Sequence, residues 1–136
     1  HKMKMENLNI QYTPHTPSIN FDALSGVMEI KGRCIPNNPD EFWSDVLLWF
    51  DAYIQNPAKE TKFIINLEYF NITSSKRILF LLYKLNELFN NGHVAKVDWF
   101  YRENEADMFE VGQDYAYMVK VPFNFYSFDE LDLVAI

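Results

Sequence analysis

Cysteine occurs once in the 136 residues, at Cys34, which excludes an internal disulfide. Glycine occurs only four times, and no predicted junction between a strand and a helix carries the glycines of a nucleotide-binding loop. His15 and His93 lie far apart in the chain and Cys34 is near neither, so a nucleophile–base pair or a metal site would need chance convergence. These scarcities predict a protein that is not an enzyme and that holds neither a metal nor a cofactor.

Positively charged residues are also few. The 12 Lys and Arg are outnumbered by 19 Asp and Glu, which gives a net charge of −7, and the cations are scattered along the chain. A basic surface for nucleic acid or anionic lipid is therefore not indicated. Because no apolar run approaches the roughly 20 residues of a membrane span, and no signal peptide is visible, we expect a cytoplasmic protein that binds neither nucleic acid nor membrane.

Apolar and aromatic residues are abundant, at 49% and 17% of the chain, and they are sufficient to build the core of one domain. We set residues 1–5 apart as a start region, in which His1-Lys2 resembles an expression remnant ahead of the first Met. Residues 6–136 are predicted to form a single domain.

Strand patterns come first. Residues 8–12 alternate as an edge strand does, and residues 19–21 and 27–30 flank a turn that ends in Ser25-Gly26, which predicts a hairpin. Helix and strand patterns then alternate three times. The expected helices cover about 38–54, 74–90 and 104–119, and the expected strands cover about 62–69, 94–101 and 123–128. This order predicts an α/β domain with one mixed sheet that is mainly parallel at its centre.

The first predicted helix carries Trp43 and Trp49, six residues apart. Residues with that separation do not share a narrow helical stripe, so we expect one of the two to be exposed for a partner. The acids of the last helical region are predicted to spread over a solvated outer face rather than to gather around a cation; they are Glu103, Glu105, Asp107, Glu110 and Asp114.

The most informative stretch is the polar junction from Glu68 to Arg77, between the predicted central strand and the longest helix. Free N–H groups and the helix dipole favour an anion at such a position. One interpretation is that Thr73 or Ser74 only caps the helix. A second is a phosphorylation site among Thr73, Ser74 and Ser75, and a third is a site for a small bound anion.

Residues 69–76 read Tyr-Phe-Asn-Ile-Thr-Ser-Ser-Lys, and this segment resembles the Tyr-Phe-Asn-Thr-Ser-Ser-Ser-Lys type of segment in the SiaC family of regulatory phosphoproteins. Further similarities follow in the same order along most of the chain. They lie at Thr16-Pro17, between Gly32 and Pro39, at Trp99 with Tyr101, and at Pro122-Phe123-Asn124. The sequence departs from the pattern at Ile72, where Thr is commoner, so the accepting hydroxyl is expected at Thr73 or Ser74.

This resemblance implies a STAS-like fold, related to anti-sigma-factor antagonists, and a bacterial protein that changes partners when the start of its second helix is phosphorylated. It implies as partners a serine/threonine kinase, a phosphatase and, in some systems, a diguanylate cyclase. On this interpretation the partner-binding residues are Tyr69, Asn71, Lys76 and Arg77, with Asn71 shaping the turn and Lys76 or Arg77 meeting the phosphate or an acidic partner.

Overall fold

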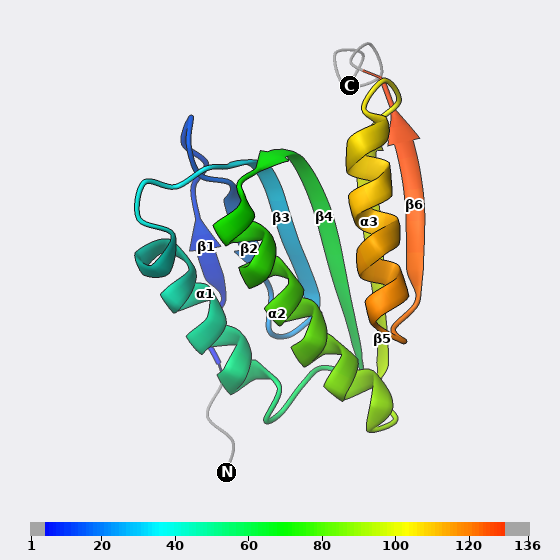
Figure 1. Ribbon diagram of the computed structural model, residues 1–136. Helices are drawn as coiled ribbons and strands as arrows, with labels where there is room; N and C mark the ends of the chain where they lie inside the picture. The colour runs from blue at the N-terminus through cyan, green and yellow to red at the C-terminus, as the bar shows by residue number, and fades with distance from the viewer. Residues whose placement is uncertain (1–4, 130–136) are drawn as a thin grey trace.

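The computed structural model describes residues 5–129, so the predicted start region before Met5 and the end of the predicted domain after Asp129 lie outside it (Figure 1). Within those residues, strands and helices follow one another as the alternating patterns predict. The elements are β1 (Leu8–Ile10), β2 (Ser18–Phe21), β3 (Val27–Cys34), α1 (Pro39–Tyr53), β4 (Glu60–Phe70), α2 (Ile72–Asn90), β5 (Val94–Arg102), α3 (Ala106–Met118) and β6 (Phe123–Phe128).

The six strands form one sheet whose spatial order is the order of the sequence, from β1 to β6. Strands β1, β2 and β3 pair antiparallel, whereas β3 to β6 pair in parallel, which confirms the predicted mixed sheet. Each crossover from β3 onward moves one strand in the same direction. Right-handed crossovers of that kind place all three helices on one face, and Figure 1 shows α1, α2 and α3 in front of the sheet.

Local chemistry explains where these elements begin and turn. Asn38 caps α1 by accepting the Glu41 N–H at 3.2 Å, with Pro39 at the first helical position. Gly26 has a φ of +79° in the turn between β2 and β3, and a Cβ there would lie 1.9 Å from the carbonyl oxygen of Glu60. Only glycine therefore allows the hairpin to close against the start of β4.

The core fills the space between the helices and the sheet. Alternate residues of each strand point toward the helices, as Phe63, Ile65 and Leu67 do on β4. The intervening residues face the side of the sheet that the helices leave uncovered. Within residues 5–129, the structure is therefore a two-layer domain in which no helix covers the second face of the sheet.

The expectation of an exposed tryptophan on α1 is wrong. Trp43 is completely buried, and Trp49 is half-buried because its ring stacks on Tyr53 and packs against Phe21. The Trp49 indole N–H also donates to the carbonyl oxygen of Glu6 at 2.8 Å. Both rings stabilise the domain, because α1 is covered by the sheet on one side and by the N-terminal segment on another.

Candidate functional site

The start of α2 lies at the carboxyl end of β4, one residue after the strand ends. Asn71 is the capping residue: its side-chain oxygen accepts the Ser74 N–H at 2.9 Å, and its carbonyl oxygen accepts the Ser75 N–H at 2.9 Å. The helix thus begins two residues earlier than predicted, and neither Thr73 nor Ser74 is its cap. Because the side-chain amide of Asn71 caps the helix, the hydroxyls of Thr73, Ser74 and Ser75 are not needed as caps.

The three consecutive hydroxyls have different surroundings. Ser74 is completely buried, and its oxygen accepts the indole N–H of Trp43 at 3.2 Å. The Ser75 hydroxyl donates to the carbonyl oxygen of Ile72 at 2.6 Å. Thr73 is exposed, and its side chain makes no hydrogen bond with any other residue between 5 and 129. Of the three, Thr73 offers the most accessible hydroxyl.

Cys34, at the end of β3, lies beside the buried Ser74 and Trp43. Burial raises the pKa of its thiol to about 11, and its contacts with Ser74 and Trp43 offset only part of that shift. The thiol is therefore protonated at neutral pH and is a small packing group rather than a nucleophile. Together the three side chains join β3, α1 and α2 beneath the hydroxyl cluster.

The electrostatics of the first turn favour negative charge. The backbone N–H groups of Ile72 and Thr73 donate to nothing else in the described chain, and the turn contains no acidic side chain. Lys76 follows one turn later and is exposed. Arg77 is half-buried and forms an ion pair with Asp40 of α1. An anion on Thr73 would thus meet free donors and a nearby cation.

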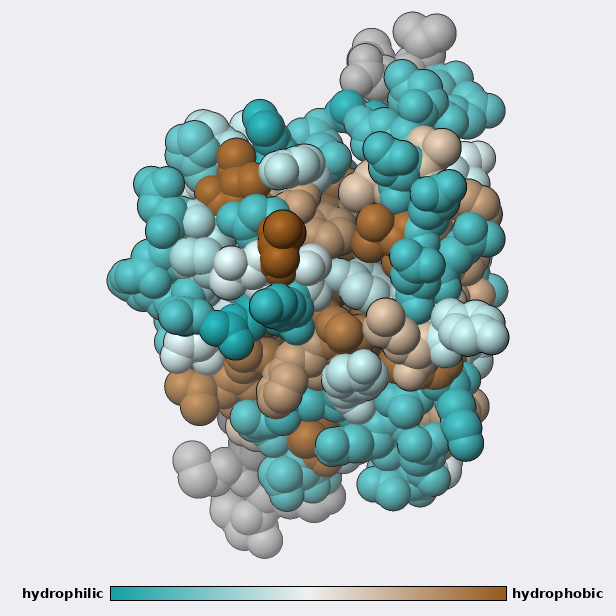
Figure 2. All heavy atoms as spheres, viewed as in Figure 1, coloured by the Kyte–Doolittle hydropathy of each residue, from teal (hydrophilic) through white to brown (hydrophobic). Residues whose placement is uncertain are grey.

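Hydrophobic side chains are exposed around the same turn. Ile72 is 78% exposed and Tyr69 is 53% exposed. Figure 2 shows hydrophobic spheres among hydrophilic ones across the centre of this helix-bearing face. Single exposed apolar side chains are common on folded proteins, so these two indicate an interaction surface only together with the accessible hydroxyl beside them.

A second element, α3, contacts the first turn of α2 from the other side. The Tyr115 hydroxyl donates to the carbonyl oxygen of Ser75 at 2.9 Å, and burial raises the pKa of this phenol to about 12. Sequence patterning places Tyr115 only on the buried stripe of its helix. Neither this bond nor the one from Trp43 has a signal in the sequence, because each joins residues more than 30 positions apart.

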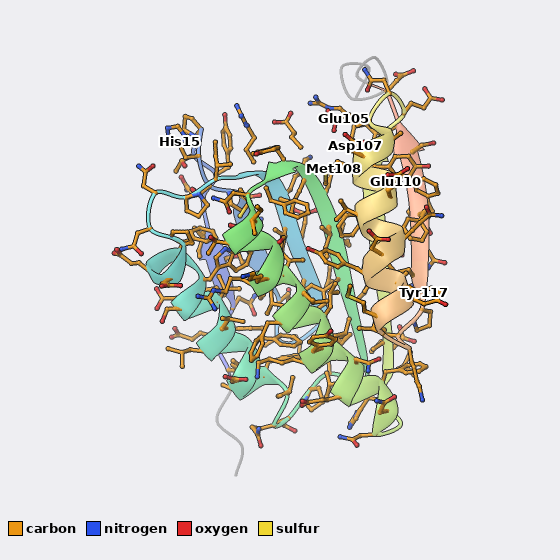
Figure 3. All side chains as sticks on the ribbon, viewed as in Figure 1. His15, Glu105, Asp107, Met108, Glu110 and Tyr117 are labelled. Carbon is orange, nitrogen blue, oxygen red and sulfur yellow. The ribbon has the colours of Figure 1, made fainter. Side chains whose placement is uncertain are left out.

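A hollow of about 570 Å³ lies between the end of β4 and the start of α3, and its walls include Tyr69 and Phe70 next to the cap. The α3 side contributes Glu105, Asp107 and Met108, which Figure 3 labels. Among residues 5–129, no group of three or more His, Cys, Asp or Glu side chains could hold a metal ion. The hollow therefore extends the surface around the start of α2.

The structure gathers most of the predicted site residues at one place. The start of α2 is surrounded by Tyr69, Asn71, Thr73 and Lys76. Ser74 points inward to Trp43, and Arg77 points to Asp40 of α1. These features define a small α/β domain that presents an accessible hydroxyl at a helix start and has no metal cluster in its described part.

Comparison with known proteins agrees with that class. Residues 10–128 match the family model described as SiaC family regulatory phosphoprotein, so the chain belongs to the SiaC family. An uncharacterized protein of Pseudomonas aeruginosa (strain UCBPP-PA14) is 25% identical over 126 residues, which cover 93% of this chain and all of that protein. The family resemblance read from residues 69–76 is thereby confirmed.

Two solved structures share the fold. SiaC of Pseudomonas aeruginosa is 24% identical, with a TM-score of 0.84 over 91% of this chain and 100% of that one. A chain in the crystal structure of the diguanylate cyclase SiaD in complex with its activator SiaC, from the same organism, is 23% identical, with a TM-score of 0.85 over 89% and 99%. No helix formed by residues 5–129 is long and apolar enough to cross a lipid bilayer.

Proposed function

We propose that this chain is a non-catalytic cytoplasmic regulator that changes protein partners when Thr73 is phosphorylated. The observation that carries the proposal is the contrast between neighbouring hydroxyls at the start of α2. Thr73 is exposed and unbonded within the described chain, whereas Ser74 is buried against Trp43 and Ser75 is bonded to its own helix. A kinase reaches Thr73 without unfolding the turn.

A phosphate on Thr73 changes the charge of the surface while leaving the fold intact. It adds about −1.5 to −2 charges at pH 7, next to the free N–H groups of the helix start. The Lys76 ammonium is one turn away, and Arg77 can exchange Asp40 for the phosphate. A protein docked on the exposed side chains of Tyr69 and Ile72 would then meet added negative charge next to them.

The effector we propose is a diguanylate cyclase, and the enzymes that set the switch are a serine/threonine kinase and a phosphatase. Membership of a family of regulatory phosphoproteins supports a modified, regulated state. The shared fold with the SiaC chain that activates SiaD supports a cyclase as the partner. The unmodified chain binds this effector, and phosphorylation prevents docking, because added charge at a desolvated interface is unfavourable.

The test compares wild type with Thr73→Ala and Thr73→Asp. We expect intact-mass measurement of protein from its native cells to show one added phosphate, which peptide mapping places on Thr73. Thr73→Ala should lose the phosphate and keep effector binding. Thr73→Asp should fold normally but bind the cyclase at least about tenfold more weakly, since a single unfavourable charge at an interface is worth on the order of 1.4 kcal/mol.

Ser75→Ala is the matched control, because the Ser75 hydroxyl lies in the same turn but already donates to the Ile72 carbonyl oxygen. This variant should change neither the amount of phosphate nor the affinity for the cyclase. Phosphate found on Ser74 or Ser75 instead of Thr73, or on none of the three, would overturn the proposal. An anion that is lost when the protein is denatured would instead identify the helix start as a small-anion site.

A further inference from the structure

A second hollow lies on the opposite face of the sheet, turned away from the viewer in Figure 1. Its volume is about 570 Å³, and it crosses the carboxyl ends of β3, β4 and β5. The side chains of Lys31, Arg33 and Arg102 in this lining have the opposite parity to the core residues of their strands, so they point to the face without helices. The side chains used below are those of Tyr12, Lys31, Arg33, Glu68, Arg102 and Phe128.

The walls of this groove are held in place by the backbone. The pairing of β3 with β4 shifts by one residue after Gly32, so that Glu68 is the additional residue of β4. The segment that carries Tyr12 is closed by the bond from the Thr13 N–H to the Thr16 carbonyl oxygen at 2.9 Å. A second bond, from the Ile35 N–H to the His15 carbonyl oxygen at 2.8 Å, ties that segment to the end of β3.

The charge of the groove is opposite to that of the protein. Three of the 12 cationic side chains line it, against one of the 19 acids. Arg102 pairs with Glu68 and Glu105. Lys31 and Arg33 are exposed and form no ion pair with any residue between 5 and 129. A positive, concave surface on a protein of charge −7 attracts acidic groups selectively.

The spacing of the cations favours a chain of carboxylates over one small anion. Lys31 and Arg33 are on β3 and Arg102 is on β5, so the two groups are about 10 Å apart across the sheet, at about 4.8 Å per strand. Glu68 lies between them on β4 and would repel an anion placed centrally. The aromatic rings of Tyr12, which is 67% exposed, and Phe128 add apolar surface on the two sides.

We propose that this groove is a docking surface for an extended acidic segment of a partner protein, with an apolar residue that packs on the exposed ring of Tyr12. Carboxylates of that segment pair with Lys31 and Arg33, which have no such partner within the described chain. The surface is on the other side of the sheet from the helices, so it works independently of phosphorylation at Thr73. The protein can then hold one partner on each face.

The probe is a fluorescein-labelled peptide, Gly-Asp-Glu-Leu-Asp-Glu-Phe-Gly, titrated with the full chain at low salt and followed by fluorescence anisotropy. We expect saturable binding that weakens as salt is added. The double variant K31E/R33E should bind at least about tenfold more weakly, as expected for two reversed charges. Tyr12→Ala should weaken binding without changing its salt dependence.

Two controls distinguish binding in this groove from a general effect of net charge and from binding at the start of α2. The double variant K59E/K120E makes the same change of net charge at two exposed lysines. These lysines precede β4 and β6 and so lie at the opposite end of the strands from the groove. The variant should change the affinity for the peptide less than about twofold. Thr73→Ala should bind the peptide as wild type does, so failure of the phosphorylation proposal leaves this result unaffected. Urea unfolding of each variant verifies that it folds.

Four outcomes would overturn the proposal. The first is no saturable binding, and the second is equal binding of the peptide with Asn and Gln in place of its acids. The third is displacement by sodium phosphate beyond the effect of sodium chloride at equal ionic strength, which would assign the groove to a small anion. The fourth is tighter peptide binding by a chain that stops at Asp129, which would assign the groove to residues 130–136.

Discussion

Two adjacent hydroxyls at the start of α2 have opposite roles because one helical step turns the side chain by about 100°. Thr73 points to solvent, while Ser74 points inward and accepts a hydrogen bond from the buried Trp43 indole. A buried N–H must have an acceptor, so Ser74 is held by the core. This arrangement separates the hydroxyl that can be modified from the one that supports the fold.

Ser74→Ala should therefore destabilise the protein although it removes only one oxygen atom. The change takes away the acceptor of the buried Trp43 N–H, which is expected to lower the free energy of unfolding by about 1–3 kcal/mol. Urea unfolding followed by tryptophan fluorescence measures the difference. Thr73→Ala is the control and should change stability by less than about 0.5 kcal/mol. A Ser74→Ala variant as stable as wild type would show that the Trp43 N–H finds another acceptor.

The helix α2 is fixed at its first turn by contacts from both neighbouring helices. Trp43 of α1 bonds to the Ser74 side chain, and Tyr115 of α3 bonds to the Ser75 carbonyl oxygen. Backbone groups at a helix start are otherwise free to fray. The turn that carries Thr73 is therefore rigid before any partner binds, so docking there requires little additional ordering.

Tyr115→Phe tests whether α3 holds that turn. Loss of the hydroxyl removes the bond to Ser75 and should lower the free energy of unfolding by about 1 kcal/mol. Hydrogen exchange should become faster at the amides of the first turn of α2 and remain unchanged at the C-terminal end of that helix. Tyr117→Phe is the matched control, because Tyr117 is on the same helix and is 95% exposed. Exchange that is equally slow in Tyr115→Phe and wild type would contradict the role given to this bond.

At the scale of the described domain, residues 5–129, the helices cover one face of the sheet and leave the other face without a helix. The covered face buries ionisable groups, among them Cys34 and Tyr115, whose charged forms are disfavoured there. The open face carries polar and aromatic side chains, such as the stacked pair Phe100 and Tyr126. Stability therefore depends on keeping the covered layer uncharged, whereas charge on the open layer is available for binding.

Stability is expected to fall at alkaline pH for this reason. The ordinary pKa values of Cys34 and Tyr115 are 9.0 and 10.0, and burial raises them to about 11 and about 12. Well below pH 9 both groups are protonated in the folded and in the unfolded chain, so the stability that their protonated forms give is fully present. As pH rises from about 9 to about 12, the unfolded chain releases protons that the folded chain keeps, and each group removes roughly 2–3 kcal/mol.

Urea unfolding at several values from about pH 8 to about pH 11 measures this loss. Cys34→Ala removes the thiol contribution, so its free energy of unfolding should decrease less steeply over this range than that of wild type. Parallel curves for the variant and wild type would show that the thiol titrates at its ordinary pKa in the folded protein.

Local patterning was enough to predict the alternation of helices and strands and the mixed sheet. The cap at Asn38, the turn at Gly26 and the stripe of α2 act within a few residues of the chain, so their effects are visible in the sequence. The segment 69–76 was likewise enough to indicate the SiaC family. The predicted start of α2 is two residues late because hydroxyls and amides both cap helices well, and the sequence does not show which of them caps this helix.

Contacts between distant residues were decided only by the packed fold. Trp49 is covered because it meets Tyr53, Phe21 and Glu6, and Ser74 is buried because α1 places Trp43 beside it. The groove over β3 to β5 exists because three crossovers put every helix on the same face. Periodicity specifies that a side chain points to one side of its element, but the neighbours it meets there depend on how the elements pack.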